Sequence, residues 1–244
     1  ARDRFLMISG CKTDFGAFCV AAAGSGEGKT TISLALMRAI SRRGLKVQPF
    51  KCGPDYIDTQ FHDSACGRKS RNLDSWMMGI DGVGKSFATA SQDSDFAVIE
   101  GVMGMFDSAA PGNLEGSTAQ TALITGCPVI LVVNAKGMAG SIAAMVKGYS
   151  EFCPQIRVAG VIANNTGSDG HAEILRKALE IANLPPLLGY FPRNDSWKMP
   201  ERHLGLVPCS ENTLDDSYFE MLADAAEKYC DIDRIMILSR MPRP

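Results

Sequence analysis

The stretch Gly24-Ser25-Gly26-Glu27-Gly28-Lys29-Thr30-Thr31 decides the fold class predicted for this chain. It lies between a short apolar run, Ala17–Ala22, and a segment of helical period, Lys29–Arg43. Its glycines allow backbone N–H groups to turn inward around phosphate oxygens, and the following helix adds the positive end of its dipole. Lys29 is placed to reach β and γ phosphates, and Thr30 offers a hydroxyl to Mg²⁺. All eight residues are therefore predicted to form a phosphate-binding loop (P-loop) for a nucleotide.

Two positions of this loop depart from related patterns. The strict P-loop pattern has a glycine where this chain has Ala23, but the Gly-Lys-Thr ending in its strand-to-helix position sustains the prediction. Partitioning and cell-division ATPases carry a second lysine early in the loop, where this chain has Gly24. The missing lysine argues against an ATPase that switches by dimerising.

Short apolar runs alternate with longer segments of helical period, which is typical of βαβ units and a parallel sheet. The predicted strands are Ala17–Ala22, Leu45–Phe50, Asp95–Glu100, Pro128–Asn134, Val158–Ala163, Leu187–Tyr190 and Leu204–Val207. The predicted helices are Lys29–Arg43, Thr118–Thr125, Ala139–Phe152, His171–Ala182 and Thr213–Tyr229. This order favours an α/β fold with a doubly wound, mostly parallel sheet between two helix layers, a three-layer α/β/α arrangement.

The composition is that of an ordinary globular domain. The 244 residues are 45% hydrophobic and 21% charged, and the formal net charge is -2. These values exclude disordered and collagen-like chains, and the charge balance does not indicate a nucleic-acid surface. No apolar run reaches the roughly 18 residues of a membrane-spanning helix, so we expect no contact with a membrane.

The eight cysteines and three histidines match no disulfide or zinc pattern. The cysteines are irregularly spaced and include no C-x-x-C pair. The histidines do not supply paired ligands at close spacing. We therefore expect reduced thiols in a cytoplasmic protein.

Acidic side chains accompany two of the predicted strands. Glu100 ends the apolar run that begins at Phe96, and open α/β sheets bind ligands at this carboxyl end. A carboxylate there is suited to hold Mg²⁺, and the alternative is a solvated loop residue. Pro54 suits the first position of a helix, which would place Asp55 and Asp58 on one face of its opening turn. The pair predicts metal or acid/base chemistry, and the alternative is that it complements the helix dipole.

Three further features have both a functional and a structural interpretation. Asp107, on the glycine-rich stretch after Glu100, is either a site carboxylate or a turn residue. The segment Arg68-Lys69-Ser70-Arg71-Asn72 is either an anion-binding cluster or a solvated helix end. His62 follows Asp58 by four residues on the same helix face, where we expect it to pack rather than to act.

With these residues the chain resembles the synthetase domain of the cobyrinic acid a,c-diamide synthase family, part of a wider P-loop group that includes dethiobiotin synthetase. The resemblance covers roughly residues 17 to 230. It rests on separated blocks: Gly28-Lys29-Thr30-Thr31, Gln48-Pro49-Phe50-Lys51, Gly53-Pro54-Asp55-Tyr56-Ile57-Asp58, Ser70-Arg71-Asn72-Leu73-Asp74, Ile99-Glu100-Gly101-Val102-Met103-Gly104, Gly116-Ser117-Thr118-Ala119 and Glu201-Arg202-His203-Leu204-Gly205-Leu206.

The resemblance implies a dethiobiotin synthetase-like fold and an ATP-dependent amide ligase of cobalamin biosynthesis. Such a ligase transfers the γ-phosphoryl group of ATP to a substrate carboxylate, and ammonia then displaces phosphate from the acyl phosphate. By resemblance, Lys29 and Lys51 neutralise phosphate or carboxylate charge, while Asp58 and Asp107 lie near the acyl phosphate. The metal ligands that it implies are Thr30, Asp55 and Glu100.

The resemblance also implies residues that bind the two larger substrates. Asn164, which follows the predicted strand Val158–Ala163, would bind the adenine of ATP, and its alternative is a turn cap. The residues expected to face a carboxylate-rich tetrapyrrole, a corrinoid, are Tyr56, Ile57, Arg68, Arg71 and Asn72.

The predicted organisation is an N-terminal extension (1–16), a synthetase domain (17–230) and a C-terminal linker (231–244) to a missing glutamine amidotransferase domain. A natural disordered terminus is equally consistent with the last segment. None of the eight cysteines lies in the strand-turn-helix elbow of a glutaminase. We therefore expect the chain to use free ammonia, or ammonia from a partner glutaminase, and a homodimer is compatible with the sequence.

Three alternatives to cobyrinic acid amidation stay open at this point. A P-loop ATPase that switches by dimerising belongs to a different functional class. Dethiobiotin synthetase, and amidation of sirohydrochlorin or sirohaem, are minor enzyme alternatives. Detection of amidated cobyrinic acid separates the main prediction from all three.

Overall fold

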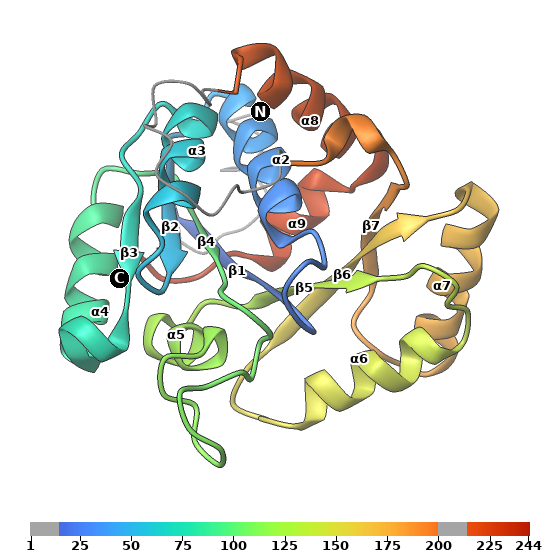
Figure 1. The fold of residues 1–244 in the computed structure, drawn as a ribbon, viewed down its shortest axis with the longest axis horizontal. Coiled ribbons are helices and arrows are strands. Elements are labelled where there is room, and N and C mark those ends of the chain that lie inside the picture. The colour runs from blue at the N-terminus through green and yellow to red at the C-terminus, as the bar shows by residue number, and fades with distance from the viewer. Residues whose placement is uncertain (1–14, 200–213) are drawn as a thin grey trace, which may run out of the picture.

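A computed structural model describes residues 15–199 and 214–244 of the chain. Seven strands of this part form one sheet, in which every neighbouring pair runs parallel and the order is β3-β2-β4-β1-β5-β6-β7 (Figure 1). The strands are β1 (Gly16–Ala22), β2 (Val47–Cys52), β3 (Arg71–Leu73), β4 (Phe96–Glu100), β5 (Val129–Asn134), β6 (Val158–Thr166) and β7 (Leu187–Pro192).

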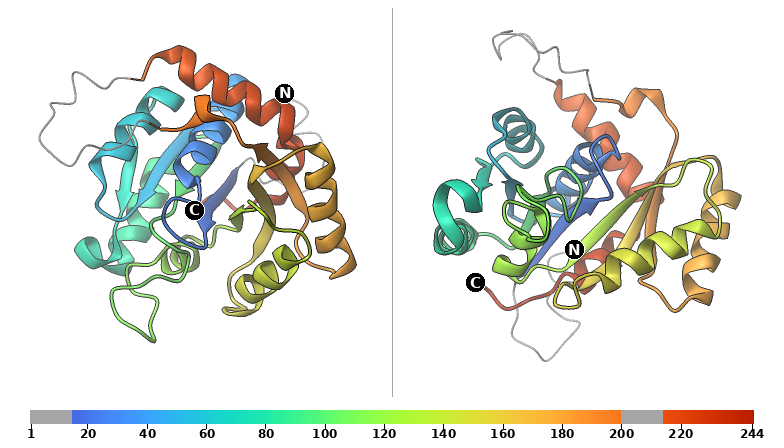
Figure 2. Two further views of the ribbon diagram at one scale, coloured as in Figure 1. Left: turned by 45° about the vertical axis from the view of Figure 1, so that its right-hand side comes forward. Right: turned by 60° about the horizontal axis from the view of Figure 1, so that its bottom comes forward.

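Helices cover both faces of the sheet, which confirms the predicted doubly wound, three-layer α/β/α fold (Figure 2). One face packs against α2 (Lys29–Arg42), α3 (Tyr56–Cys66), α8 (Asp216–Tyr229) and α9 (Ile232–Leu238). The other packs against α4 (Ser75–Ser91), α5 (Thr118–Thr125), α6 (Ser141–Glu151) and α7 (Asp169–Ile181).

The central strand β1 shows why this sequence folds in layers. All seven of its residues are buried, as expected for a parallel strand covered on both faces. Phe18, Val20 and Ala22 point into the core under α2, while the alternate residues contribute to the core under α4 and α5. The chain leaves β1 between β4 and β5, so the P-loop lies at the carboxyl edge of the sheet centre.

The structure differs from the predicted elements in a few places. The strand β3 and the helix α4 were not predicted, because β3 has three residues and α4 contains several glycines. Gly79 interrupts the helical dihedral angles of α4 with φ 70° and ψ 172°. The predicted strand Leu204–Val207 lies outside the described residues.

The C-terminal segment is part of the folded domain, which corrects the predicted linker at 231–244. Ile232, Ile235 and Met236 of α9 are buried in the core beneath α2. After the helix, Arg240 forms a β-bridge with Gly16, at the start of β1. The apolar run of this segment is therefore explained by burial within the domain.

Two features of the described residues relate to the composition. The six cysteines described there are free thiols. In that same part of the chain, no helix is long and apolar enough to cross a membrane.

Candidate active site

The P-loop joins β1 to α2, as predicted. Gly26 and Gly28 have positive φ angles of 77° and 97°, a backbone region that residues with a Cβ atom rarely adopt. A Cβ atom on Gly28 would also collide with the side-chain amide of Asn164. Lys29 begins α2, and its Nζ donates a hydrogen bond to the carbonyl oxygen of Gly24 at 2.7 Å. The loop therefore closes on its own lysine in this structure.

A cleft of about 720 Å³ opens beside this loop, at the carboxyl ends of the strands. Most of the predicted nucleotide, metal and catalytic residues line it: Ser25, Gly26, Gly28, Lys29, Thr30, Thr31, Lys51, Asp55, Asp58, Glu100 and Asn164. Several predicted residues do not line it: Gly24, Glu27, Tyr56, Ile57, Arg68, Arg71, Asn72 and Asp107.

Buried charges form the floor of the cleft. Lys51 and Glu100 are directly paired in the register of β2 and β4, and the Lys51 Nζ lies 2.9 Å from the Glu100 Oε1. The same Nζ lies 2.7 Å from the Oδ2 of Asp58, on the first turn of α3. The three side chains are at most 5% exposed. One ammonium therefore lies between two carboxylates, and its charge is already engaged by the protein.

The electrostatics of this group follow from burial and from its hydrogen bonds. Burial by itself would raise the pKa of Glu100, but the Lys51 ammonium and hydrogen bonds from His62 and Thr30 outweigh it and hold the pKa well below the ordinary value. Burial and the neighbouring Glu100 raise the pKa of Asp58, and Lys51 offsets this only in part. Burial would lower the pKa of Lys51, but the two carboxylates raise it above its ordinary value.

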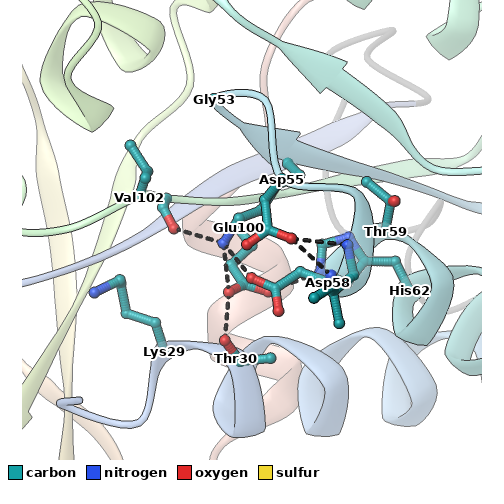
Figure 3. Close-up of polar contacts among 12 residues, drawn as sticks. Lys29, Thr30, Gly53, Asp55, Asp58, Thr59, His62, Glu100 and Val102 are labelled. Atoms are coloured by element: carbon teal, nitrogen blue, oxygen red, sulfur yellow. Dashed lines mark hydrogen bonds and ion pairs between the residues drawn. The ribbon is translucent and has the colours of Figure 1, made fainter. Parts of the chain in front are cut away.

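His62 belongs to this group, which corrects the expectation that it only packs. Its ring is fully buried, its Nε2 lies 2.7 Å from the Glu100 Oε2, and its Nδ1 lies 3.1 Å from the Ser70 Oγ. Thr30 of α2 and His62 of α3 contact the Glu100 carboxylate, while Asp58 contacts the Lys51 ammonium that Glu100 shares. Figure 3 draws these side chains together. The spacing of four residues correctly predicted that His62 and Asp58 share one face of the helix. The contact between His62 and Glu100 of β4 depends, in addition, on how α3 packs against the sheet.

Thr30 and Glu100 together have the chemistry of a magnesium site. The Thr30 Oγ1 donates a hydrogen bond to the Glu100 Oε1 at 2.6 Å, so two oxygen ligands lie side by side at the start of α2. No cluster of three or more His, Cys, Asp or Glu side chains suited to a metal occurs among residues 15–199 and 214–244. Mg²⁺ does not need one, because it usually keeps several waters and binds one or two carboxylates together with substrate phosphates.

Asp55 caps a helix in addition to lining the cleft. Its Oδ1 accepts hydrogen bonds from the backbone N–H groups of Ile57 and Asp58, at 2.8 Å and 3.1 Å. It is the N-cap residue of α3. Pro54 therefore lies before the helix, and the prediction that it occupies the first helical position is wrong. Asp55 is thus the helix-dipole partner that the sequence left as an alternative, while Asp58 points into the charged floor.

Asn164 lies where the sequence predicted it, at the end of β6 and in the cleft. Its Nδ2 donates to the Glu27 carbonyl oxygen at 2.8 Å, which joins β6 to the P-loop. The Glu27 side chain accepts a hydrogen bond from the backbone N–H of Asn134, on β5. Both contacts fix the loop against neighbouring strands.

The predicted basic cluster does not line the cleft. Arg68 and Arg71 line a separate hollow with Gln48, close to the amino end of β2, and Arg68 pairs with Asp93 at 2.7 Å. Asn72 donates to the backbone carbonyl oxygens of Gly53 and Asp55. It therefore shapes the loop before α3 and does not line the cleft.

Two other groups lie beside the cleft and not on its lining. Tyr56 and Ile57, on the first turn of α3, are 75% and 46% exposed and face solvent. Asp107 is exposed, and its Oδ2 accepts a hydrogen bond from the Gly104 N–H at 2.7 Å. Asp107 thus has the turn geometry that the sequence left as an alternative. Its negative charge still acts on Lys29: it raises the pKa of that lysine, but burial lowers the same pKa by more.

Sequence reasoning missed one wall of the cleft, residues 191–199 at the end of β7 and after it. Asn194, Trp197 and Lys198 lie on it, and the Thr31 Oγ1 donates to the Trp197 carbonyl oxygen at 3.4 Å. Tyr218 of α8 donates to the same oxygen at 2.9 Å. No short sequence motif marks this segment. It reaches the cleft because of where the preceding strand β7 lies in the sheet, two strands away from β5, and a local pattern does not encode that position.

Comparisons with known proteins agree with this geometry. Residues 18–207 match the family model described as the CobQ/CobB/MinD/ParA nucleotide binding domain. Proteins named cobyrinate a,c-diamide synthase from Priestia megaterium and Syntrophotalea carbinolica are 46% and 49% identical over 92% and 90% of this chain. Chloroplast FtsY from Physcomitrella patens has a similar fold, with a TM-score of 0.54, 12% identity, and coverage of 89% of this chain and 67% of its own.

The chain spans about half the length of the curated relatives it matches, 49% and 48% for these two. The family model, by contrast, covers most of the chain and includes the P-loop, the charged floor and Asn164. By this match the chain belongs to the CobQ/CobB/MinD/ParA nucleotide binding domain family.

Proposed function

We propose that this chain catalyses the ATP- and Mg²⁺-dependent amidation of the a and c side-chain carboxylates of cobyrinic acid, or of a closely related tetrapyrrole, in cobalamin biosynthesis. The observation that carries the proposal is the buried group of Lys51, Asp58 and Glu100 beside the P-loop, in a chain 46% identical to a cobyrinate a,c-diamide synthase. An ATP-dependent ligase needs both parts, one to hold phosphates and one to align a carboxylate with them.

Thr30 and Glu100 would hold Mg²⁺, with Asp55 on the same side of the cleft. The bound ion would neutralise negative charge on the phosphate oxygens. Lys29 would exchange its hydrogen bond with the Gly24 carbonyl oxygen for one with a phosphate oxygen. Burial and the nearby Lys51 lower the pKa of Lys29, which means that they disfavour its charged form. A negatively charged phosphate bound beside Lys29 would stabilise that charged form.

The reaction class is phosphoryl transfer followed by amide formation. A carboxylate oxygen of the substrate attacks the γ-phosphorus of ATP, the bond to ADP breaks, and an acyl phosphate forms. The nitrogen of ammonia then bonds to the carbonyl carbon and gives up a proton, while phosphate leaves. We place Asp58 and Asp107 near the acyl phosphate, where Lys51 would keep the Asp58 carboxylate oriented.

We further propose that ammonia is supplied either free or by a glutaminase partner. The matched relatives are about twice as long as this chain. Their additional length would be sufficient for a domain that releases ammonia from glutamine. If this holds, the chain amidates its substrate with ammonium salts. Amidation by this chain with glutamine as its sole nitrogen source would contradict the idea.

The deciding experiment supplies the purified chain with ATP, Mg²⁺, ammonia and cobyrinic acid and follows the tetrapyrrole by mass spectrometry. We expect stepwise replacement of carboxyl hydroxyl by amino groups, each step accompanied by one ADP. ATP turnover that no tetrapyrrole stimulates and no product accompanies would favour a nucleotide-dependent switch instead. Parallel incubations with sirohydrochlorin and sirohaem identify the preferred macrocycle.

A further inference from the structure

Each oxygen of the Glu100 carboxylate has its own set of partners. Oε1 accepts a hydrogen bond from Thr30 at 2.6 Å and lies 2.9 Å from the Lys51 ammonium. Oε2 lies 2.7 Å from the Nε2 of His62. The two oxygens are thus distinguished by the protein, and it is Oε1 that contacts the residue at the start of α2.

The direction of the His62 hydrogen bond follows from its partner. Glu100 is ion-paired with Lys51 and accepts from Thr30, so its oxygens act as acceptors. The Nε2 of His62 must then carry the hydrogen, whatever the charge of the ring. Ser70, which immediately precedes β3, contacts the opposite ring nitrogen at 3.1 Å and holds the ring from behind.

We propose that His62 is a positioning residue for magnesium binding. It holds the Glu100 carboxylate in the orientation that presents Oε1 to Thr30, and Ser70 supports the ring. The inference rests on the proposed function to the extent that Glu100 and Thr30 hold Mg²⁺. It concerns the nucleotide half of the reaction alone, so it does not depend on which tetrapyrrole is amidated.

The geometry gives His62 this role because Lys51 has no donor to spare for the second oxygen of Glu100. The three N–H donors of its ammonium lie near Glu100 Oε1, Asp58 Oδ2 and the Gly101 carbonyl oxygen, at 2.9, 2.7 and 3.2 Å, and rotation of the Glu100 carboxylate about its Cγ–Cδ bond would draw Oε1 away from Thr30. The His62 hydrogen bond occupies Oε2 in a fully buried position and opposes that rotation. Residues that orient a metal ligand in this manner typically change metal affinity by roughly 10- to 100-fold when removed.

The test measures ADP binding by titration calorimetry, with and without Mg²⁺, for wild-type protein and His62→Leu, His62→Gln and Ser70→Ala. We expect His62→Leu to weaken Mg²⁺-dependent ADP binding roughly 10- to 100-fold while binding without Mg²⁺ changes little. The side-chain amide introduced by His62→Gln can still donate to Glu100, so this variant should recover most of the loss. Ser70→Ala should give a smaller loss in the same direction.

Ser64→Ala is the matched control, because this serine is exposed on the same helix and its hydroxyl donates to the Gln60 carbonyl oxygen of that helix. Equal losses of ADP affinity with and without Mg²⁺, or no rescue by glutamine, would show a structural role and overturn the proposal. If His62→Leu does not fold, Ser70→Ala decides, and unchanged Mg²⁺ dependence of ADP binding in that variant would overturn the proposal. A chain with the expected Mg²⁺ dependence and no amidation product would refute the proposed reaction but not this role.

Discussion

The Nζ of Lys51 lies 2.7 Å from the Oδ2 of Asp58, and both side chains are at most 5% exposed. This contact joins β2 to α3 directly beneath the cleft. Because Glu100 shares the same ammonium, the floor carries one more negative than positive charge when His62 is neutral. Such a floor favours an additional cation at its exposed side, where Thr30 lies.

Removal of the shared ammonium should destabilise the fold. Lys51→Met leaves Asp58 and Glu100 buried without their counter-ion, and we expect the free energy of unfolding to fall by about 3–5 kcal/mol. The double variant Lys51→Met/Asp58→Asn should be less affected than Lys51→Met alone, because one uncompensated charge is removed. Urea unfolding measures both.

The control for Lys51 is Lys69→Met, which removes an ion pair with Asp63 from a lysine that is 91% exposed. Its effect on the free energy of unfolding should be far smaller than that of Lys51→Met, as for other exposed ion pairs. Similar losses for the two lysines would contradict the importance of the buried group.

The stability of the protein should fall in acid, in part because of Glu100. Its pKa is lower in the folded protein than its ordinary value of 4.5, so it stabilises the fold above that pH, and the contribution is lost as the pH falls towards the folded pKa. Asp58, whose pKa is raised, contributes with the opposite sign. Urea unfolding from about pH 7 to about pH 3 should show a shallower acid decline for Glu100→Gln than for wild type.

Glu180→Gln provides the comparison for this pH series, because Glu180 is exposed on α7. Its profile should run parallel to that of the wild-type protein. An unchanged acid slope in Glu100→Gln would mean that other groups account for the acid sensitivity.

Lys29 and Asp58 should separate nucleotide turnover from amidation. Lys29→Ala removes the group expected to reach the phosphates, and we expect it to abolish ATP turnover. Asp58→Asn keeps the P-loop intact, and we expect it to bind ATP with little change while losing the amidated product. Calorimetry and mass spectrometry report the two steps, and equal loss of ATP binding in both variants would refute the assigned roles.

Gly28 should be far less tolerant of a side chain than other glycines with positive φ. In Gly28→Ala the new methyl group meets the Asn164 amide that bonds the loop, so both loop geometry and ADP affinity should suffer. Gly44 has a comparable φ of 81° and no atom within 4 Å of a Cβ placed there. Gly44→Ala thus carries the backbone cost, about 1 kcal/mol, without the collision.

Calorimetric ADP titrations of Gly28→Ala and Gly44→Ala compare the two sites directly. Only the former should lose affinity. Comparable binding in both variants would show that the contact between Gly28 and Asn164 is not needed for the nucleotide site.

Arg71 should be dispensable for the reaction, despite its place in the predicted basic cluster. It lines the hollow near Gln48 and not the cleft, so Arg71→Ala should leave the KM for the tetrapyrrole unchanged. A rise in KM of tenfold or more, about 1.4 kcal/mol, would place the substrate across both surfaces. Amidation kinetics over a range of substrate concentrations provide the measurement.

Local sequence patterns were sufficient for the scaffold of the site. The apolar run of β1, the glycines and the amphipathic α2 specify a P-loop without reference to the rest of the chain, because each feature depends on neighbours a few residues away. The same applies to Glu100, whose position at the end of a buried strand places it at the ligand-binding edge. These predictions agreed with the structure in position and in environment.

Tertiary structure decided how the charged residues are used. Lys51 and Glu100 are 49 residues apart and become partners only because β2 and β4 are adjacent and in register. His62 meets Glu100 only because α3 packs over that pair, and Arg68 turns away because its carboxylate partner, Asp93, precedes β4 at the opposite edge. The sequence alone determined the P-loop fold and the residue types at its site, because both follow from short-range periodicity. The pairing of buried charges required the strand order and helix packing, because electrostatic partners are chosen by distance in space.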